Sequence, residues 1–165
     1  MIPTEGILTA LTRNWEMVDR ALSGLNEAAL AWQPSDQANS IAWTLWHMNR
    51  VLDTLVHTRL QDTPQVWIRD GWSQKYGMDD DPENRGVGWT AEQVAAMQPP
   101  SAAVQLGYFE AVKNSAKQYL ESLSYADMEV IRVILPAPDP RTVAAAVGQV
   151  TWDNVAHGGQ IAYIR

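Results

Sequence analysis

Two of the three histidines in this 165-residue chain lie where a metal ion could use them. His47 lies in SIAWTLWHMNRVLD, at 40–53, and His157 follows Asp153 by four residues in TWDNVAHGGQIAYIR, at 151–165. Residues four apart on a helix project from one face, about 40° apart. If the helix that carries His47 is a neighbour, the three side chains can meet at one end of the core. Imidazole and carboxylate suit Zn, Ni, Fe or Mn, and three ligands plus water form an open, catalytic metal site.

The same three residues also have a purely structural interpretation, because a D-x-x-x-H spacing occurs on many helices by chance. His157 can be a surface histidine near a helix C-terminus, where the helix dipole favours a cation. His47 can be a histidine at the edge of the core that bonds a backbone carbonyl, and Asp153 a solvated acid. Spacing alone leaves both interpretations open.

Helical periodicity predicts the elements that would position these side chains. Apolar residues recur every three or four positions in four main segments, at 4–23, 40–61, 101–123 and 142–165. Ser40, Ser101 and Thr142 can cap the last three segments, and Thr90 can cap a shorter helix at 90–97. With little strand signal, the pattern predicts an all-α fold, an antiparallel four-helix bundle. The length predicts a single domain over 1–165.

A long connection separates the second and third predicted helices, at about 64–100. A loop of this length in a compact domain is usually functional or disordered, and its aromatic residues argue against disorder. The aromatic residues of this connection are Trp67, Trp72, Tyr76 and Trp89. They can form the walls of a pocket over the metal site or pack together as a satellite core. Shorter loops are predicted at 31–40 and 136–142.

Arg50 lies one turn after His47 and is a candidate to bind a substrate or cofactor, together with Trp67 and Trp72 of the connection. It can contact an anionic group or form a surface salt bridge. His57 lies about 80° round the helix from His47, so we expect it at the surface rather than as a fourth ligand.

Two glycines and a glutamine follow the last histidine of the chain. Gly158 and Gly159 each cost about 1 kcal/mol relative to alanine inside a helix, and close helix packing explains them better than a ligand role. Gln160 can form a hydrogen bond to a loop or to a neighbouring helix.

Composition excludes several classes of function. The net charge is −7, with twelve Lys and Arg scattered among nineteen acidic residues, whereas nucleic-acid binding needs clustered basic residues. The chain has no basic amphipathic helix for a membrane surface, no apolar run long enough to span a membrane and no signal peptide at its start. We therefore expect a cytoplasmic protein that binds no nucleic acid and no membrane. Without cysteine, a metal site must use His, Asp, Glu or water.

The stretches SIAWTLWHMNRVLD and HGGQIAYIR resemble the DinB-like superfamily, which includes the YfiT-like proteins. The resemblance implies a DinB-like four-helix bundle with a long connection. In this family a histidine of the second helix and an H-x-x-x-H-x-G-Q-I stretch on the fourth bind one divalent metal. By this likeness His47 and His157 are ligands, and Asp153 stands where the family more often has its middle histidine. Zn or Ni is the expected metal.

The resemblance also implies a metal-dependent enzyme that acts on a small electrophilic molecule. It would be a transferase of a low-molecular-weight thiol, such as bacillithiol or mycothiol, or a hydrolase, because a metal lowers the pKa of a bound thiol or water. The alternative is a non-catalytic bundle that binds a small molecule or a partner, with weak or absent metal. The acid at Asp153 keeps that alternative open. Since related bundles often pair, we expect a homodimer.

Overall fold

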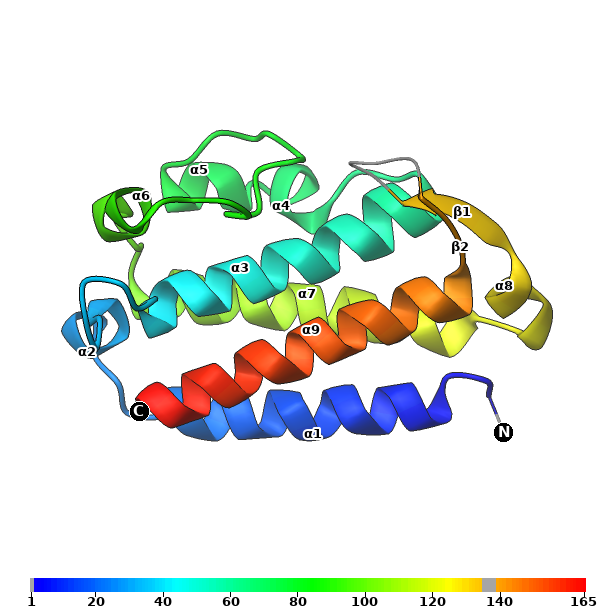
Figure 1. The fold of residues 1–165 in the computed structure, drawn as a ribbon, viewed down its shortest axis with the longest axis horizontal. Helices are drawn as coiled ribbons and strands as arrows, with labels where there is room; N and C mark the ends of the chain where they lie inside the picture. Colours follow the sequence, from blue (N-terminus) through cyan, green and yellow to red (C-terminus); the bar gives the residue numbers. More distant parts are fainter. Residues whose placement is uncertain (1, 135–138) are drawn as a thin grey trace.

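The computed structural model describes residues 2–134 and 139–165. Its frame is a bundle of four long helices (Figure 1), namely α1 (Glu5–Leu22), α3 (Ile41–Asp53), α7 (Ala102–Ser122) and α9 (Val143–Ile164). The α3 helix continues as the π-helix η1 (Thr54–Gln61), and together they fill the predicted segment 40–61. The bounds of all four predicted segments agree with the observed helices to within one residue at either end. The predicted all-α fold is confirmed.

Side-chain caps begin the helices at the residues that the sequence marks. Ser40, Ser101 and Thr142 each accept a hydrogen bond from the backbone N–H three residues further on. Thr90 forms a capping box at the start of α6 (Ala91–Ala96), the predicted shorter helix. Such caps satisfy N–H groups that the first turn of a helix leaves without partners.

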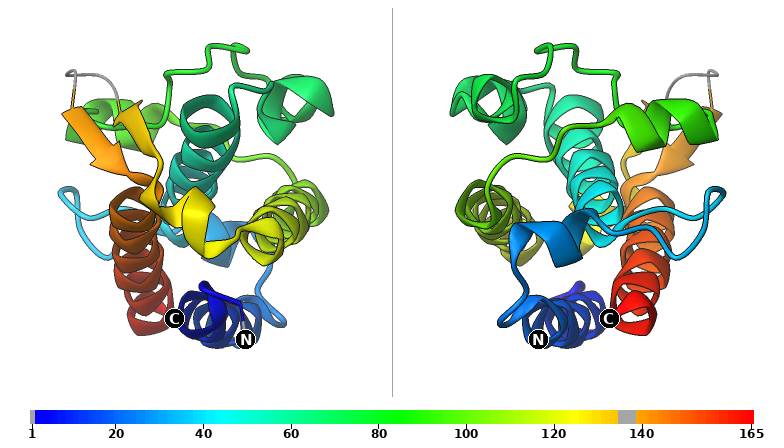
Figure 2. Two further views of the ribbon diagram at one scale, coloured as in Figure 1. Left: turned by 90° about the vertical axis from the view of Figure 1, so that its right-hand side faces the viewer. Right: turned by 90° about the vertical axis from the view of Figure 1, so that its left-hand side faces the viewer.

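The helices are not all antiparallel to their neighbours. In Figures 1 and 2, α1 and α9 run in one direction and α3 and α7 run in the other. The Thr4 hydroxyl donates to the Leu120 carbonyl, which places the start of α1 beside the end of α7. Arg165 donates to the carbonyls of Arg20 and Ala21, so that α1 and α9 end together. The bundle differs from the antiparallel expectation because the connection travels back along α3 before α7 begins.

The long connection is folded and packed rather than an open loop. It contains α4 (Val66–Arg69), α5 (Trp72–Tyr76) and α6, and it covers the outer side of α3 in Figure 2. The Trp67 ring is buried. Its centroid lies 5.2 Å from the ring centroid of Tyr76 and 5.2 Å from that of Tyr108 in α7. The aromatic residues of α4 and α5 therefore extend the main core.

Further short elements lie outside both the predicted helices and the connection. They are α2 (Glu27–Ala31), α8 (Tyr125–Glu129) and an antiparallel pair of strands, β1 (Ile131–Ile134) and β2 (Asp139–Thr142). The second strand overlaps the loop that we predict at 136–142, so residues 139–142 correct that prediction, while residues 136–138 lie outside the described residues. The pairing of Ile131 with Thr142 places the hairpin next to the start of α9.

Buried apolar side chains from all four long helices and from the connection form a core cluster. In the described ranges, no helix combines the length and the apolar character needed to cross a membrane.

Candidate metal centre

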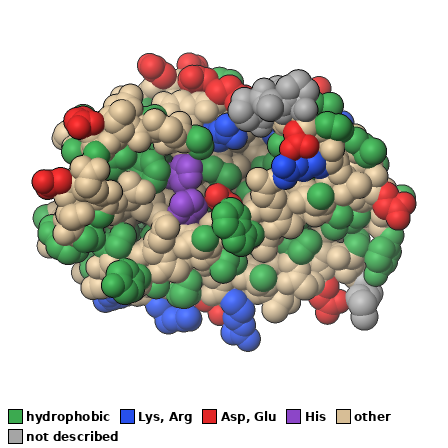
Figure 3. Space-filling model, viewed as in Figure 1, with side chains coloured by type: hydrophobic (Ala, Val, Ile, Leu, Met, Phe, Trp, Pro, Cys, Tyr) green, Lys and Arg blue, Asp and Glu red, His purple; other side chains and the backbone are tan. Residues whose placement is uncertain are grey.

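The structure brings the three predicted ligands together. His47 projects from α3, Asp153 and His157 project from α9, and one ligand atom of each lies within 4.8 Å of the other two. Figure 3 shows histidine atoms in a hollow on the face of α3 and α9, with acidic atoms beside them. Since α3 and α9 run antiparallel side by side, a residue near the middle of α3 meets residues near the middle of α9.

His47 is held in one orientation by its neighbours. Its ring stacks on Trp43, with the two planes 7° apart. Its Nδ1 bonds the backbone carbonyl of Arg85, which can only accept, so Nδ1 carries the proton. The Nε2 atom then keeps its lone pair for a ligand role. Burial lowers the pKa of His47 below its ordinary value, which keeps the imidazole neutral.

His157 has a similar arrangement on α9. Its Nδ1 lies 2.8 Å from Oε1 of Gln160, and its Nε2 lies 3.5 Å from Oδ1 of Asp153. The interaction with Asp153 raises the pKa of His157, against the opposing effect of burial. Metal-bound histidines commonly donate their other N–H to such an oxygen, which fixes the tautomer and the ring.

Asp153 provides the test of whether a cation fits. Its Oδ2 atom is buried and has no hydrogen-bond partner among the described residues. Buried polar atoms normally have partners, and an ionised carboxylate accepts only. A divalent cation among the carboxylate and the two Nε2 atoms would satisfy all three groups. The donor set of two imidazoles and one carboxylate, with a position left for water or substrate, therefore fits a catalytic metal.

Close packing against α1 fixes the backbone beneath His157. A Cβ atom on Gly158 would overlap the Asn14 side chain of α1. Asn14 in turn donates to the Asn154 carbonyl at 2.9 Å, and Trp15 donates to the Asn154 side chain at 3.0 Å. Close helix packing thus explains Gly158. It does not explain Gly159, where a Cβ would meet no atom of the described residues within 4 Å.

Arg50 lies in the core rather than at the surface. It has no exposed surface, and its guanidinium donates to the carbonyls of Asn84 and Asp81 and to the side chain of Gln65. It also lies over the Trp67 ring, 4.8 Å from the centroid. The structure therefore gives Arg50 neither an exposed ion pair nor an open anion contact, because it anchors the connection to α3.

The two candidate tryptophans also lie away from the three clustered residues. Trp67 is buried in the core, and Trp72 is half-buried against Gly107 of α7, with the Lys75 ammonium over its ring. Tyr76 and Trp89 line a cavity of about 680 Å³ within the connection, between the segment that follows α5 and the helix α6. The aromatic residues of the connection thus do not form one wall over the predicted metal site.

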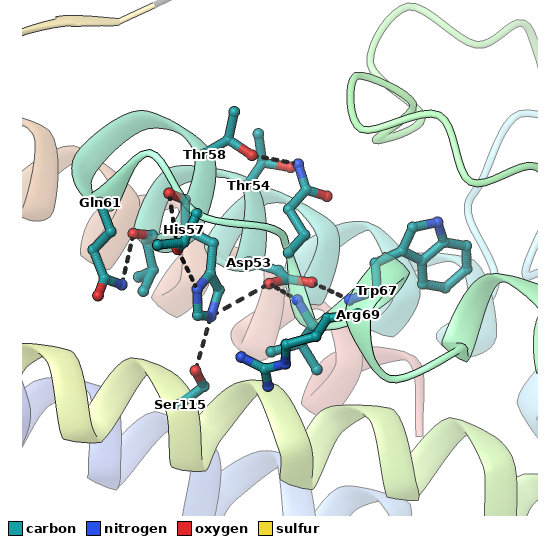
Figure 4. A network of polar contacts seen from close by, with 12 residues as sticks. Asp53, Thr54, His57, Thr58, Gln61, Trp67, Arg69 and Ser115 are labelled. Carbon is teal, nitrogen blue, oxygen red and sulfur yellow. Dashed lines mark hydrogen bonds and ion pairs between the residues drawn. The ribbon is translucent and has the colours of Figure 1, made fainter.

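His57 is buried, which corrects the surface position that we expect from the sequence. Its Nε2 lies 2.8 Å from the Ser115 hydroxyl of α7 and 3.7 Å from Oδ1 of Asp53 (Figure 4). Burial lowers the pKa of His57, and the nearby Asp53 opposes that shift. His57 packs between η1 and α7, far along the helix from His47.

Two groups that orient the histidines, the Gln160 side chain and the Arg85 carbonyl, are not predicted from the sequence. Gln160 is three residues after His157, a spacing that places it on the same helix face, and this signal was available. The Arg85 carbonyl is a backbone group of the connection, so no residue type could have indicated its contact with His47.

Comparisons with known proteins agree on the fold. A family model described as the DinB superfamily matches residues 10–161. A protein from Enterococcus faecalis, described as the conserved protein of locus, has a crystal structure that matches with a TM-score of 0.88 and 22% sequence identity. The match covers 99% of this chain and 95% of that chain, and at this identity it shows the fold alone. No curated protein sequence matches the chain at a significant level.

Proposed function

The chain belongs to the DinB superfamily, and from that premise we propose that it is a metal-dependent enzyme. His47, Asp153 and His157 would hold one divalent ion, Zn or Ni. The observation that carries the proposal is the buried Oδ2 of Asp153, which lacks a hydrogen-bond partner among the described residues and belongs to a side chain clustered with two imidazoles.

The chain's own groups prepare the site for a small substrate. The Arg85 carbonyl and Gln160 orient the two imidazoles through their Nδ1 atoms, and Trp43 covers one face of His47 against water. Asp153 and His157 are 22% and 18% exposed, so a reactant can approach from their side. When bound, the metal lowers the pKa of a thiol or water and so supplies a nucleophile at neutral pH.

The reaction that we propose is transfer of a low-molecular-weight thiol, such as bacillithiol or mycothiol, to a small electrophile. Hydrolysis of a small molecule by activated water is the second candidate. The sequence resemblance supports the thiol reaction, and the half-open ligand set of two imidazoles and one carboxylate is compatible with both.

Metal content tests the proposal directly. The protein is purified without added metal, and bound metals are counted by mass spectrometry of the elements and by titration with Zn and Ni. We expect one metal per chain, lost in His47→Ala, while His57→Ala keeps it. A chain that binds no metal would support the alternative of a non-catalytic bundle that binds a small molecule or partner.

Activity is tested with a panel of thiols and electrophiles. The metal-loaded protein is assayed for thiol consumption with bacillithiol, mycothiol and glutathione, and for hydrolysis without thiol. Turnover that disappears in His47→Ala supports an enzyme. Full metal occupancy without turnover in any arm favours the binding protein.

We also propose that the protein forms a homodimer in the cytoplasm. Exposed apolar side chains on the outer side of α9 support the dimer, above all Val155 and Tyr163. Sedimentation at several concentrations would detect the dimer, and a monomer at the highest concentration would contradict it. Cell fractionation tests the location.

A further inference from the structure

A second cavity begins at the outer side of Asp153. It has a volume of about 270 Å³, slightly below the range of about 300–1,000 Å³ that is usual for drug-sized ligands. Its lining comes from α3 and η1, from the connection, from β1 and from α9. Because Asp153 borders both the cavity and the candidate metal centre, a small molecule in this cavity would lie next to the proposed reaction.

The walls of the cavity are mostly apolar. Val51 and Leu55 line one side and Val150 lines the other, and Trp152 stands at the border with 70% of its surface exposed. An exposed tryptophan beside an apolar cavity offers a large contact surface for the carbon skeleton of a ligand.

Two arginines interrupt the apolar lining, Arg59 of η1 and Arg85 of the connection. The Arg59 side chain is only 7% exposed and the Arg85 side chain 18%. The buried Nε atom of each has no hydrogen-bond partner among the described residues. A buried donor without a partner costs about 1–3 kcal/mol, and an acceptor that reached either group would remove that cost.

The guanidinium groups of Arg59 and Arg85 share one carboxylate partner, Glu83. Arg59 bonds Glu83 at 2.6 Å, and an Arg85 nitrogen lies 3.9 Å from the same carboxylate. A single carboxylate therefore faces two guanidinium groups, and Asp153, which also lines the cavity, supplies a second negative charge. Arginine pairs well with carboxylate and phosphate oxygens.

We infer that this cavity recognises small apolar molecules that carry one carboxylate or phosphate group, with the anion held by Arg59 and Arg85. The inference rests on the proposed function, because it names the substrate class of the same site. The apolar walls hold the rest of the molecule beside Asp153. The cavity size limits the ligand to a small molecule.

Binding of matched six-carbon ligands tests the inference. Hexanoate, hexyl phosphate and the neutral hexanamide are titrated by calorimetry into protein stripped of metal and into Zn-loaded protein. We expect one of the anions, or both, to bind at least about tenfold more tightly than hexanamide, and the better anion identifies the group. Equal affinity for all three ligands, or no binding of either anion, overturns the inference.

Two variants assign the binding to the arginines. Arg59→Gln and Arg85→Gln should each weaken binding of the anion about tenfold or more, whereas Arg69→Gln, at an exposed arginine paired with Asp70, should bind as the parent does. Circular dichroism checks that each variant folds, and Arg85→Gln keeps the backbone carbonyl that orients His47. Anion binding that is unchanged in both variants overturns the inference.

The metal-free arm separates this inference from the proposed function. A protein that binds the anion but no metal refutes the metal-dependent enzyme and leaves the anion site in place. A protein that takes one metal but does not prefer the anions refutes the anion site alone.

Discussion

The pair Asp53–His57 and the pair Asp153–His157 have the same four-residue spacing, in DTLVH and in DNVAH, yet the fold surrounds them differently. The Asp53 carboxylate accepts the backbone N–H groups of Val66 and Trp67 and the Tyr108 hydroxyl, all at 2.9 Å. Its histidine bonds Ser115. In the second pair, one carboxylate oxygen lacks a hydrogen-bond partner within the described part of the chain.

The difference teaches how to distinguish a structural pair from a candidate ligand pair. When protein donors satisfy both oxygens of a buried carboxylate, the pair supports the packing of the connection on α3 and α7. When an oxygen and an imidazole nitrogen keep free lone pairs in a half-open hollow, the pair can bind a cation. The decisive quantity is the number of unsatisfied acceptor sites, and the spacing carries no information about it.

The largest expected effect is a loss of stability when the Asp53–His57 pair is disrupted. Asp53→Ala should lower the free energy of unfolding by about 3–5 kcal/mol, because it removes the acceptor of three donors and leaves Arg50 buried without its carboxylate. Urea denaturation measures the loss. Asp19→Ala, at an exposed ion pair with Lys113, is the control and should change stability by less than about 1 kcal/mol. If Asp53→Ala also changed stability by less than about 1 kcal/mol, the Asp53–His57 pair would not have the structural role that distinguishes it from Asp153–His157.

The second effect is a loss of metal affinity when the Asp153–His157 pair is changed. Asp153→Ala should weaken metal binding by about 100-fold or more, since it removes one of three protein ligands, and should alter stability by less than about 1 kcal/mol. Asp153→His should bind metal at least as well as the parent. It should also lower the pH at which activity rises, because the metal keeps more positive charge to acidify a bound thiol or water.

Metal titration and pH–rate profiles of both Asp153 variants measure these effects. If both variants bind metal as the parent does, Asp153 is not a ligand.

A smaller effect is expected at the group that orients His157. Gln160→Ala should weaken metal binding about 10- to 100-fold, as is usual when the hydrogen-bond partner of a ligand histidine is removed. Gln118→Ala, on the exposed side of α7 near the other pair, should bind metal normally. Equal affinities of the two glutamine variants would show that Gln160 does not support the centre.

The smallest effect concerns pH, where the two histidines should act with opposite sign in metal-free protein. Burial lowers the pKa of His57 below the ordinary 6.5, so the unfolded state binds more protons and stability falls as the pH drops below about 6.5. Asp153 raises the pKa of His157, which contributes stability below the unfolded value and loses it as the pH rises through the folded one.

Unfolding free energies between about pH 5 and 7 measure these slopes. As the pH falls, the unfolding free energy should decrease less steeply in His57→Gln and more steeply in His157→Gln than in the parent. The same change of slope in both variants would contradict the assignment of opposite shifts.

Part of this picture follows from the sequence, for identifiable reasons. Helical periodicity and the caps at Ser40, Ser101 and Thr142 are local signals, and they predicted the four long helices. The resemblance directed attention to His47 and to the fourth helix, and the structure brings those residues together. Their role as ligands stays a prediction.

The sequence by itself therefore determined the helices and the three residues worth testing, because propensity, capping and periodicity act over a few neighbouring positions. Only the tertiary structure decided that Arg50 is a buried anchor, that His57 is satisfied by α7, and that Arg59 and Arg85 meet beside Asp153. Each of these outcomes depends on partners from distant segments, and burial and hydrogen-bond satisfaction are properties of the assembled fold.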